Sequence, residues 1–120
     1  MQLEKLVTNE DDRGMFVEVF KEPGQVSYIY TEPGYTRGNH YHLRKIEKFV
    51  VVGGVMEVKV KDRVKGTEMN VIASSGDPMM ITIHPNNTHM LQALDVPSLC
   101  MVWCSEAYNE DDPDTYSEEL

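Results

Sequence analysis

Turn signals recur at short intervals along this chain and leave room only for short extended segments. Pro23-Gly24 and Pro33-Gly34 lie ten residues apart, and each pair suits the two central positions of a type II turn. Further breaks of this kind occur at Gly53-Gly54, Ser74–Pro78 and Pro85–Asn87. Because no segment between these breaks carries a long 3.6-residue period, the chain is predicted to be built from strands.

The segments between the turns have the residue types and the two-residue period of strands. In Met56–Lys61, apolar and charged residues alternate, which predicts that Met56, Val58 and Val60 face a core. Further strands are predicted at residues 16–20, 25–31, 36–42, 48–52, 69–72, 79–83, 89–93 and 99–103. Only the last fifteen residues could hold a short helix. Strands at this spacing predict an antiparallel all-β sandwich or barrel, with a tight hairpin at Gly53-Gly54.

The charge of the chain is uneven along its length. Of the 20 acidic residues, seven lie beyond Ser105, where no Lys or Arg occurs, which leaves 13 acids against 11 bases before it. The part of the chain before this acidic end is so close to neutral that it offers no strong electrostatic attraction to nucleic acid or to an anionic membrane. The pattern predicts a single barrel domain over residues 1–106 and an acidic tail over 107–120. We expect the tail to be solvated and partly disordered, with docking on a partner subunit as the alternative.

The cysteines and the first residues bear on the compartment. On one strand, Cys100 and Cys104 would lie about 13 Å apart at ~3.3 Å per residue, which is too far for a disulfide. Met1–Lys5 lacks the charged-then-apolar order of a signal peptide, and no apolar run reaches the ~20 residues of a membrane helix. These observations predict reduced thiols, a cytoplasmic location and no membrane partner.

Three of the four histidines fall in a pattern that suits a metal site. His40 and His42 are two residues apart, so on a strand both imidazoles point to the same face. Glu47 opens the next predicted strand and His89 begins a later one. Three imidazoles and one carboxylate suit a divalent metal; Zn is the expected ion, and Fe, Mn or Ni are also compatible. The alternatives are a buried polar cluster, or a metal-free site in which His40 and His42 act directly on a substrate.

The same residues lie in a run that resembles the first motif of the cupin superfamily. All fixed positions of that motif are present, as Gly34-x5-His40-Tyr41-His42-x4-Glu47-x6-Gly54. Pro85–His89 resembles part of the second cupin motif, with Asn87 in the place of a glycine and expected at positive φ. Ala93 stands near the position of that motif's final asparagine. The resemblance implies a jelly-roll barrel with the four ligands inside it.

A closer resemblance covers residues 16–116. Thr36–His42, Glu47–Val51 and Met101–Tyr116 resemble the WxcM-like sugar-modifying cupins, especially the C-terminal cupin of bifunctional capsular-polysaccharide enzymes acting on UDP-linked 4-keto-6-deoxy-hexosamines. In those relatives the cupin is a metal-containing 3-epimerase, and a separate reductase domain completes the reaction. The resemblance implies an epimerase or ketoisomerase, a nucleotide-sugar substrate and a homodimer. Reduction is not carried over to this chain, because it has no Gly-rich dinucleotide loop; a separately encoded reductase could be a further partner.

Epimerisation beside a ketone needs a base, an acid and cations for the diphosphate. His84, the histidine outside the metal set, is the candidate base, with a surface turn histidine as the alternative. Tyr35 is the candidate proton donor, whereas Tyr41 lies between two inward histidines and should face away. Arg37 and Lys48 are the candidate substrate-binding cations, and a solvated charged turn is the alternative for Lys48.

Two other functional classes stay open at this point. The first is another metallocupin enzyme, a dioxygenase or a sugar-phosphate isomerase, which would share the metal ligands without needing a nucleotide pocket. The second is a non-catalytic cupin that binds sugar or dimerises and works with a separately encoded reductase.

Overall fold

The computed structural model describes residues 1–120 and consists of strands joined by turns and loops. The twelve strands are β1 (Gln2–Lys5), β2 (Thr8–Asp11), β3 (Gly14–Val17), β4 (Gln25–Thr31), β5 (Thr36–Tyr41), β6 (Glu47–Gly53), β7 (Val55–Asp62), β8 (Glu68–Ser74), β9 (Met79–Ile83), β10 (Asn87–Ala93), β11 (Ser98–Cys104) and β12 (Tyr116–Ser117). No part of the chain forms a helix with the length and apolar character that crossing a membrane requires.

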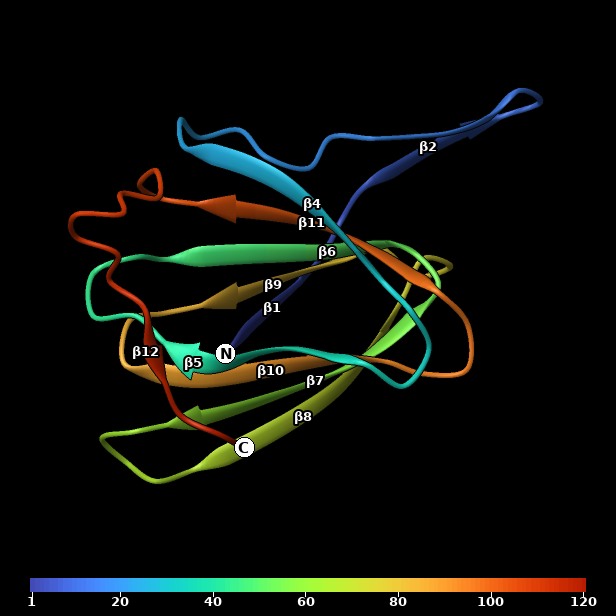
Figure 1. The fold of residues 1–120 in the computed structure, drawn as a ribbon. Coiled ribbons are helices and arrows are strands. Elements are labelled where there is room, and N and C mark those ends of the chain that lie inside the picture. Colours follow the sequence, from blue (N-terminus) through green and yellow to red (C-terminus); the bar gives the residue numbers. More distant parts are fainter.

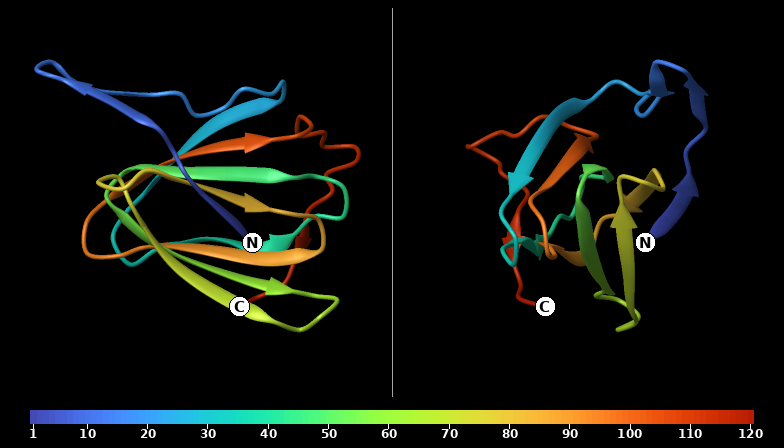
Figure 2. Two further views of the ribbon diagram at one scale, coloured as in Figure 1. Left: turned by 180° about the vertical axis from the view of Figure 1, so that it is seen from behind. Right: turned by 90° about the vertical axis from the view of Figure 1, so that its right-hand side faces the viewer.

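Two five-stranded sheets pack face to face (Figure 1). The first sheet has the order β1-β9-β6-β11-β4, and the second has the order β12-β5-β10-β7-β8. Each of their pairings is antiparallel. The β2–β3 hairpin projects from this pair of sheets as a separate arm (Figures 1 and 2). The arrangement confirms the predicted all-β, single-domain jelly roll.

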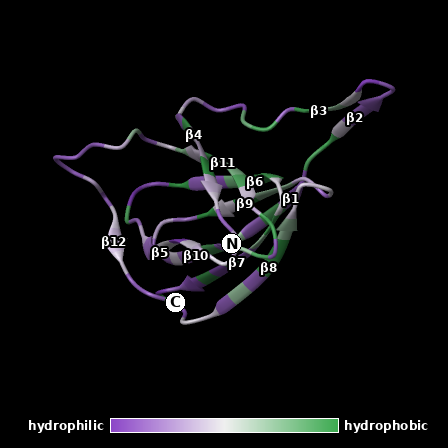
Figure 3. Cartoon of the chain, turned by 45° about the vertical axis from the view of Figure 1, so that its right-hand side comes forward, coloured by the Kyte–Doolittle hydropathy of each residue, from purple (hydrophilic) through white to green (hydrophobic).

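The core lies between the two sheets and follows from the two-residue period of the strands. Met56, Val58 and Val60 are 1%, 0% and 3% exposed, as their alternation with charged residues predicted. They meet residues of the first sheet such as Phe49 and Ile81 in one cluster of 11 buried side chains. The alternation of hydrophilic and hydrophobic residues can be followed along β8 (Figure 3). Burial of one face of each sheet therefore fixes which side chains point into the barrel.

The predicted hairpin at Gly53-Gly54 is wrong, because the strands on its two sides belong to different sheets. β6 lies in the first sheet and β7 in the second. Gly54 has a φ of +75°, which suits glycine because it has no Cβ. A Cβ at this position would overlap the carbonyl oxygen of Pro97 and the side chain of Ser98. The glycine is therefore a corner that carries the chain from one sheet to the other.

The two ends of the chain differ from the expectations drawn from the sequence. The predicted strand at 16–20 ends at Val17, and the exposed strands β1 and β2 were not predicted. The last fifteen residues hold no helix; instead β12 pairs with the edge of β5. Asp114 is only 1% exposed, so this part of the tail is not solvated as expected. The boundary at residue 106 stays a prediction.

Substitution of Gly54 should cost more stability than substitution of a glycine that shares only its positive φ. We expect Gly54→Ala to lose about 1–2 kcal/mol from the backbone conformation and about 1–3 kcal/mol more from overlap with Pro97 and Ser98. Gly66→Ala is the matched control, since Gly66 also has a positive φ (+73°) but nothing lies within 4 Å of the added Cβ. Urea denaturation of the three proteins measures this difference; equal losses would contradict the role of Gly54 as a crowded corner.

Candidate metal centre

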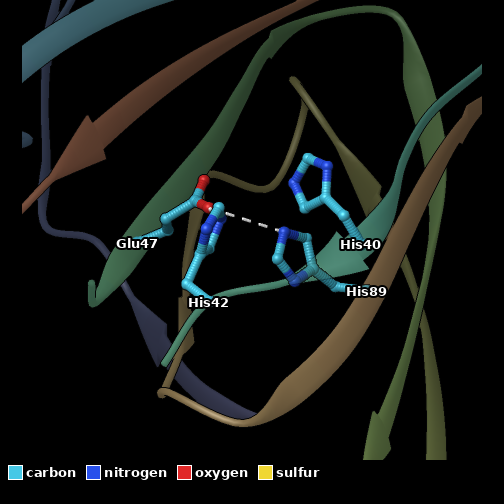
Figure 4. A group of neighbouring side chains, drawn as sticks. All are labelled: His40, His42, Glu47 and His89. Carbon is cyan, nitrogen blue, oxygen red and sulfur yellow. Dashed lines mark ion pairs between the residues drawn. The ribbon is translucent and has the colours of Figure 1, made fainter. Parts of the chain in front are cut away.

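Strands from both sheets bring three imidazoles and one carboxylate together inside the barrel. His40 in β5 and His89 in β10 are direct partners in the second sheet. His42 directly follows the end of β5, and Glu47 begins β6 in the first sheet. Figure 4 shows the four side chains pointing toward one another. Each offers one ligand atom, and these atoms all lie within 4.8 Å of one another.

The cluster is enclosed and its contacts centre on Glu47. Glu47, His42 and His89 are 6%, 6% and 1% exposed, while His40 is half-buried. Glu47 Oε1 contacts His42 Nε2 and lies 3.5 Å from His89 Nε2. The imidazole rings are 4.8–5.5 Å apart between centroids. A carboxylate thus lies beside several imidazoles in a part of the barrel with little access to water.

Backbone carbonyls orient two of the imidazoles. His42 Nδ1 lies 2.6 Å from the carbonyl oxygen of Asp114, and His89 Nδ1 lies 3.0 Å from that of Asn87. A carbonyl oxygen can only accept, so each Nδ1 carries the hydrogen and the neutral ring keeps its lone pair on Nε2. Both Nε2 atoms are buried without a regular hydrogen-bond partner. Two unpartnered nitrogen lone pairs beside a carboxylate fit a divalent cation.

The charge state of the cluster follows from its burial and its contacts. Burial, together with the nearby His89 and His42, lowers the pKa of His40 to about 4, so this ring is neutral at pH 7. Burial alone would raise the pKa of Glu47, but the adjacent rings of His42 and His89 outweigh it and hold the pKa well below its usual range. Glu47 is therefore a carboxylate at neutral pH.

The same carboxylate shifts the pKa of His42 upward, whereas the pKa of Glu47 itself is lowered. Burial would lower the pKa of His42, but its close contact with Glu47 and the charge of that carboxylate outweigh this and raise the pKa. The carboxylate thus favours a proton on His42 Nε2. A divalent cation would compete with that proton for the same position, because metal ligands must be deprotonated.

Three of the other predicted site residues are not brought to this cluster. His84 is exposed, with Nε2 3.4 Å from Gln2 Oε1, and Tyr35 is 71% exposed between β4 and β5. Lys48 points to the opposite face of β6 from Glu47, where its Nζ lies 2.6 Å from Glu22 Oε2. The catalytic roles of His84 and Tyr35 and the substrate-binding role of Lys48 stay predictions.

Arg37 lies on the interior side of β5, at the opening between the two sheets. It pairs with Leu91, a core residue, and paired residues on neighbouring strands share a face. Its Nη2 donates to the carbonyl oxygen of Tyr30 at 2.9 Å, and its Nε donates to Thr31 Oγ1 at 3.3 Å. The guanidinium therefore spans from β5 to β4, and its predicted role in substrate binding stays a prediction.

Tyr41 faces away from the cluster, as expected from its place between two inward histidines. Its ring stacks on that of Tyr116, with centroids 5.3 Å apart. The guanidinium of Arg63 lies 3.7 Å from the centre of the Tyr41 ring. This outer side of β5 is thus covered by the C-terminal segment.

Sequence reasoning missed the residues that hold the imidazoles in place. Asp114 and Asn87 act through backbone carbonyls, which leave no signature in residue type. The Asp114 side chain also accepts the backbone N–H groups of residues 43, 44 and 45, at 2.9, 3.0 and 3.1 Å. Within the acidic tail, nothing but the family resemblance of residues 112–116 separated this aspartate from its neighbours. The positive φ in the turn before His89 falls on Asn86 and not on Asn87 as expected.

Comparison with known proteins gives one family and several relatives. The model of the polysaccharide biosynthesis C-terminal domain family matches residues 9–116. The UDP-2-acetamido-2,6-beta-L-arabino-hexul-4-ose reductase of Pseudomonas aeruginosa is 32% identical over 112 residues, which are 91% of this chain and 30% of the relative. The crystal structure of the capsular polysaccharide assembling protein CapF from Staphylococcus aureus is 35% identical, with a TM-score of 0.78, over 96% of this chain and 34% of that one. The chain thus spans about a third of the length of each.

A more distant solved structure shares the fold along most of its length. The dTDP-6-deoxy-D-glucose-3,5-epimerase RmlC of Legionella pneumophila, in complex with dTDP-4-keto-L-rhamnose, is 19% identical with a TM-score of 0.84. The match covers 96% of this chain and 70% of that structure. At this level of identity the likeness supports the jelly-roll fold alone.

Removal of one imidazole should reduce metal binding while the barrel stays folded. We expect the wild-type chain to retain about one divalent ion after dialysis, and His42→Ala to lose most of it, because a three-ligand remnant binds more weakly. His84→Ala is the control, since His84 lies outside the cluster. Elemental analysis by mass spectrometry measures the content, and circular dichroism reports the fold. Wild-type metal content in a folded His42→Ala would remove His42 from the ligand set.

Proposed function

The chain belongs to the polysaccharide biosynthesis C-terminal domain family, and on that premise we propose that it is an epimerase or isomerase of a nucleotide-linked 4-keto-6-deoxy sugar in surface polysaccharide biosynthesis. The convergence of His40, His42, Glu47 and His89 inside the barrel carries this proposal. The names of two relatives support the substrate class, since one acts on a UDP-linked hexul-4-ose and the other binds dTDP-4-keto-L-rhamnose.

The cluster is proposed to hold a divalent metal, with Zn as the expected ion and Fe, Mn or Ni as alternatives. Bound there, the ion would polarise a ketone oxygen and so make the hydrogen on the neighbouring carbon acidic. Glu47 supplies the negative charge, and His42 and His89 present Nε2 toward the same point because Asp114 and Asn87 bind their Nδ1–H groups. His40, the least buried ring, completes the set.

Other residues of the chain are proposed to handle the proton and the diphosphate. Arg37 spans the opening between the sheets and offers a planar fork to a phosphate or a sugar hydroxyl. Tyr35, two residues earlier at the same end of β5, is proposed as the proton donor. His84 stays the proposed base, although a substrate would have to extend out of the cluster to meet it. The alternative is a metal-free site in which His40 and His42 act on the substrate directly.

Exchange of a substrate hydrogen with solvent tests this function. In D₂O, the metal-loaded chain should place deuterium on the carbon beside the ketone of a UDP-linked 4-keto-6-deoxy-hexosamine, which mass spectrometry detects as a gain of one mass unit. We expect His42→Ala to slow this exchange by about 100-fold or more, in the range of lost acid–base or metal chemistry.

Chelation separates the metal-dependent reaction from its alternatives. Loss of exchange on dipicolinate treatment and its return with added Zn²⁺ would support the metal site. Exchange that persists without metal would favour direct action of His40 and His42. A chain that binds the nucleotide sugar but exchanges no hydrogen would be a non-catalytic binding module, which would contradict the proposal.

A homodimer is also proposed, and the outer face of the first sheet supports it. Val26, Tyr28 and Tyr30 on β4 are 51%, 73% and 50% exposed, and Val52 on β6 is 43% exposed. None of these side chains is charged, although the chain carries a net charge of −9. Lys48 and its partner Glu22 lie elsewhere on this face, so two copies could meet along β4 without bringing like charges together.

The outer face of the second sheet provides the contrast. There the outward positions of β7 and β8 pair charged or polar residues, as in Lys59 with Asn70 and Lys61 with Glu68. A reductase encoded separately is the further partner proposed, because the Pseudomonas relative of greater length is itself a reductase. The free thiols of Cys100 and Cys104 support the cytoplasm as the compartment.

A charge placed on the apolar face should dissociate the dimer. We expect the wild-type chain to sediment as a dimer and Tyr28→Glu as a monomer at the same concentration, because two desolvated carboxylates would face each other across the two-fold axis. Ile72→Glu is the matched control, since Ile72 is 53% exposed but belongs to the second sheet. A monomeric wild type, or dissociation by Ile72→Glu alone, would argue against this interface.

A further inference from the structure

We propose that residues 113–120 form a strap that holds His42 in its ligand orientation, with Asp114 as the positioning residue. This inference rests on the metal site proposed above. It concerns how the site is kept in place and adds a residue that does not itself touch the metal position. The strap runs along the edge of β5 opposite β10, and its strand β12 pairs there with Tyr41 and His40 (Figure 1).

His42 is the one member of the cluster that no strand holds. His40 lies in β5, Glu47 in β6 and His89 in β10, and each of these strands is paired on both sides. His42 follows the last residue of β5, and no strand forms between it and Glu47. The ladders of the two sheets therefore fix three of the four residues. Outside the strap, the backbone of His42 is held by the hydrogen bond that Asn86 N donates to its carbonyl oxygen at 2.6 Å, which leaves the orientation of its ring to be fixed by another contact.

Asp114 binds both the ring of His42 and the backbone that follows it. Its carbonyl oxygen accepts from His42 Nδ1 at 2.6 Å. Its carboxylate accepts the N–H groups of Leu43, Arg44 and Lys45 at 2.9, 3.0 and 3.1 Å. The residue is 1% exposed and has a φ of +48°. The anchored carboxylate keeps the carbonyl from turning away, so the His42 acceptor stays where the ring needs it.

The rest of the strap is attached at several further points. Glu118 N donates to the carbonyl oxygen of Asn39 at 2.9 Å, and Leu120 N donates to Asn39 Oδ1 at the same distance. The Glu118 carboxylate accepts from Thr88 Oγ1 at 2.6 Å and from Arg63 Nε at 3.2 Å. These contacts reach β5 beside His40 and β10 beside His89. The strap thus ties Asp114 to the same strands that carry two other members of the cluster.

Loss of the Asp114 carboxylate should disturb the orientation of His42 more than the packing of the core. Without it, the N–H groups of residues 43–45 lose their acceptor and the carbonyl of Asp114 is free to rotate. His42 Nδ1 then has no fixed acceptor, and the ring can place its hydrogen on either nitrogen. Mutation of a partner that orients a metal-bound histidine in this way typically lowers metal affinity about 10–100-fold.

The test compares Asp114→Ala and Asp114→Asn with Asp112→Ala in the full chain. Asp112 is an exposed aspartate two residues away whose side chain contacts only Arg44, so it controls for the loss of one acidic group. Zn²⁺ affinity is measured by competition with a chelator. The visible absorption of the Co²⁺-loaded protein reports ligand geometry. Nitrogen NMR of the metal-free protein, at a pH where the His42 ring carries a single hydrogen, reports which nitrogen holds it, and thermal melting reports the fold.

We expect Asp114→Ala to bind Zn²⁺ about 10–100-fold more weakly, to change the Co²⁺ absorption, and to show a mixed His42 tautomer. Asp114→Asn keeps one acceptor oxygen and tolerates positive φ, so its losses should be smaller. Asp112→Ala should match the wild type in every readout.

Wild-type affinity and tautomer in a folded Asp114→Ala would overturn the strap while leaving the metal site standing. A wild-type chain that takes up neither Zn²⁺ nor Co²⁺ would instead contradict the metal site. The NMR readout would then still test whether Asp114 orients His42. If both Asp114 variants fail to fold, Asp114 serves folding rather than the orientation of His42, and the inference is wrong.

Discussion

The structure depends on one buried carboxylate and the imidazoles that surround it. Glu47 is 6% exposed, and an ionised carboxylate at such a depth is costly unless opposite charge or hydrogen-bond donors compensate it. His42 and His89 provide the contacts, and the direct pairing of His40 with His89 brings the third ring beside them. No single sheet could assemble this group, because the carboxylate comes from the first sheet, His40 and His89 come from the second, and His42 lies in the segment after β5.

The same arrangement places the candidate site at the ends of the barrel strands and not at their centres. The centres are filled by apolar side chains such as Val58 and Ile81, which are fully buried. The polar cluster lies where β5 ends and β6 begins, so its geometry relies on the segment between those strands. That segment is held by Asp114 from the far end of the chain, which links the C-terminal segment to the site.

Much of this could be read from the sequence wherever a local period carried the information. The alternation in β7 identified its buried face, and the two-residue spacing of His40 and His42 placed both rings on one side. The same parity places Lys48 on the outside once Glu47 is inside, as the structure has it. Gly54 was recognised as a turn, but residue types alone do not say whether a turn joins neighbours in one sheet or crosses between two. Asp114 could not be recognised, because its partners lie about seventy positions away and two of its roles use backbone atoms.

The most direct measurement is the anomalous diffraction of crystals grown without chelator, recorded on both sides of the absorption edge of each metal that elemental analysis finds. A bound ion predicts one strong difference peak inside the barrel, about 2.0–2.2 Å from the three imidazole nitrogens and from an oxygen of Glu47. A barrel with no such peak after saturation with Zn²⁺, Fe²⁺, Mn²⁺ and Ni²⁺, in which His42 Nε2 stays in contact with Glu47, would contradict the account.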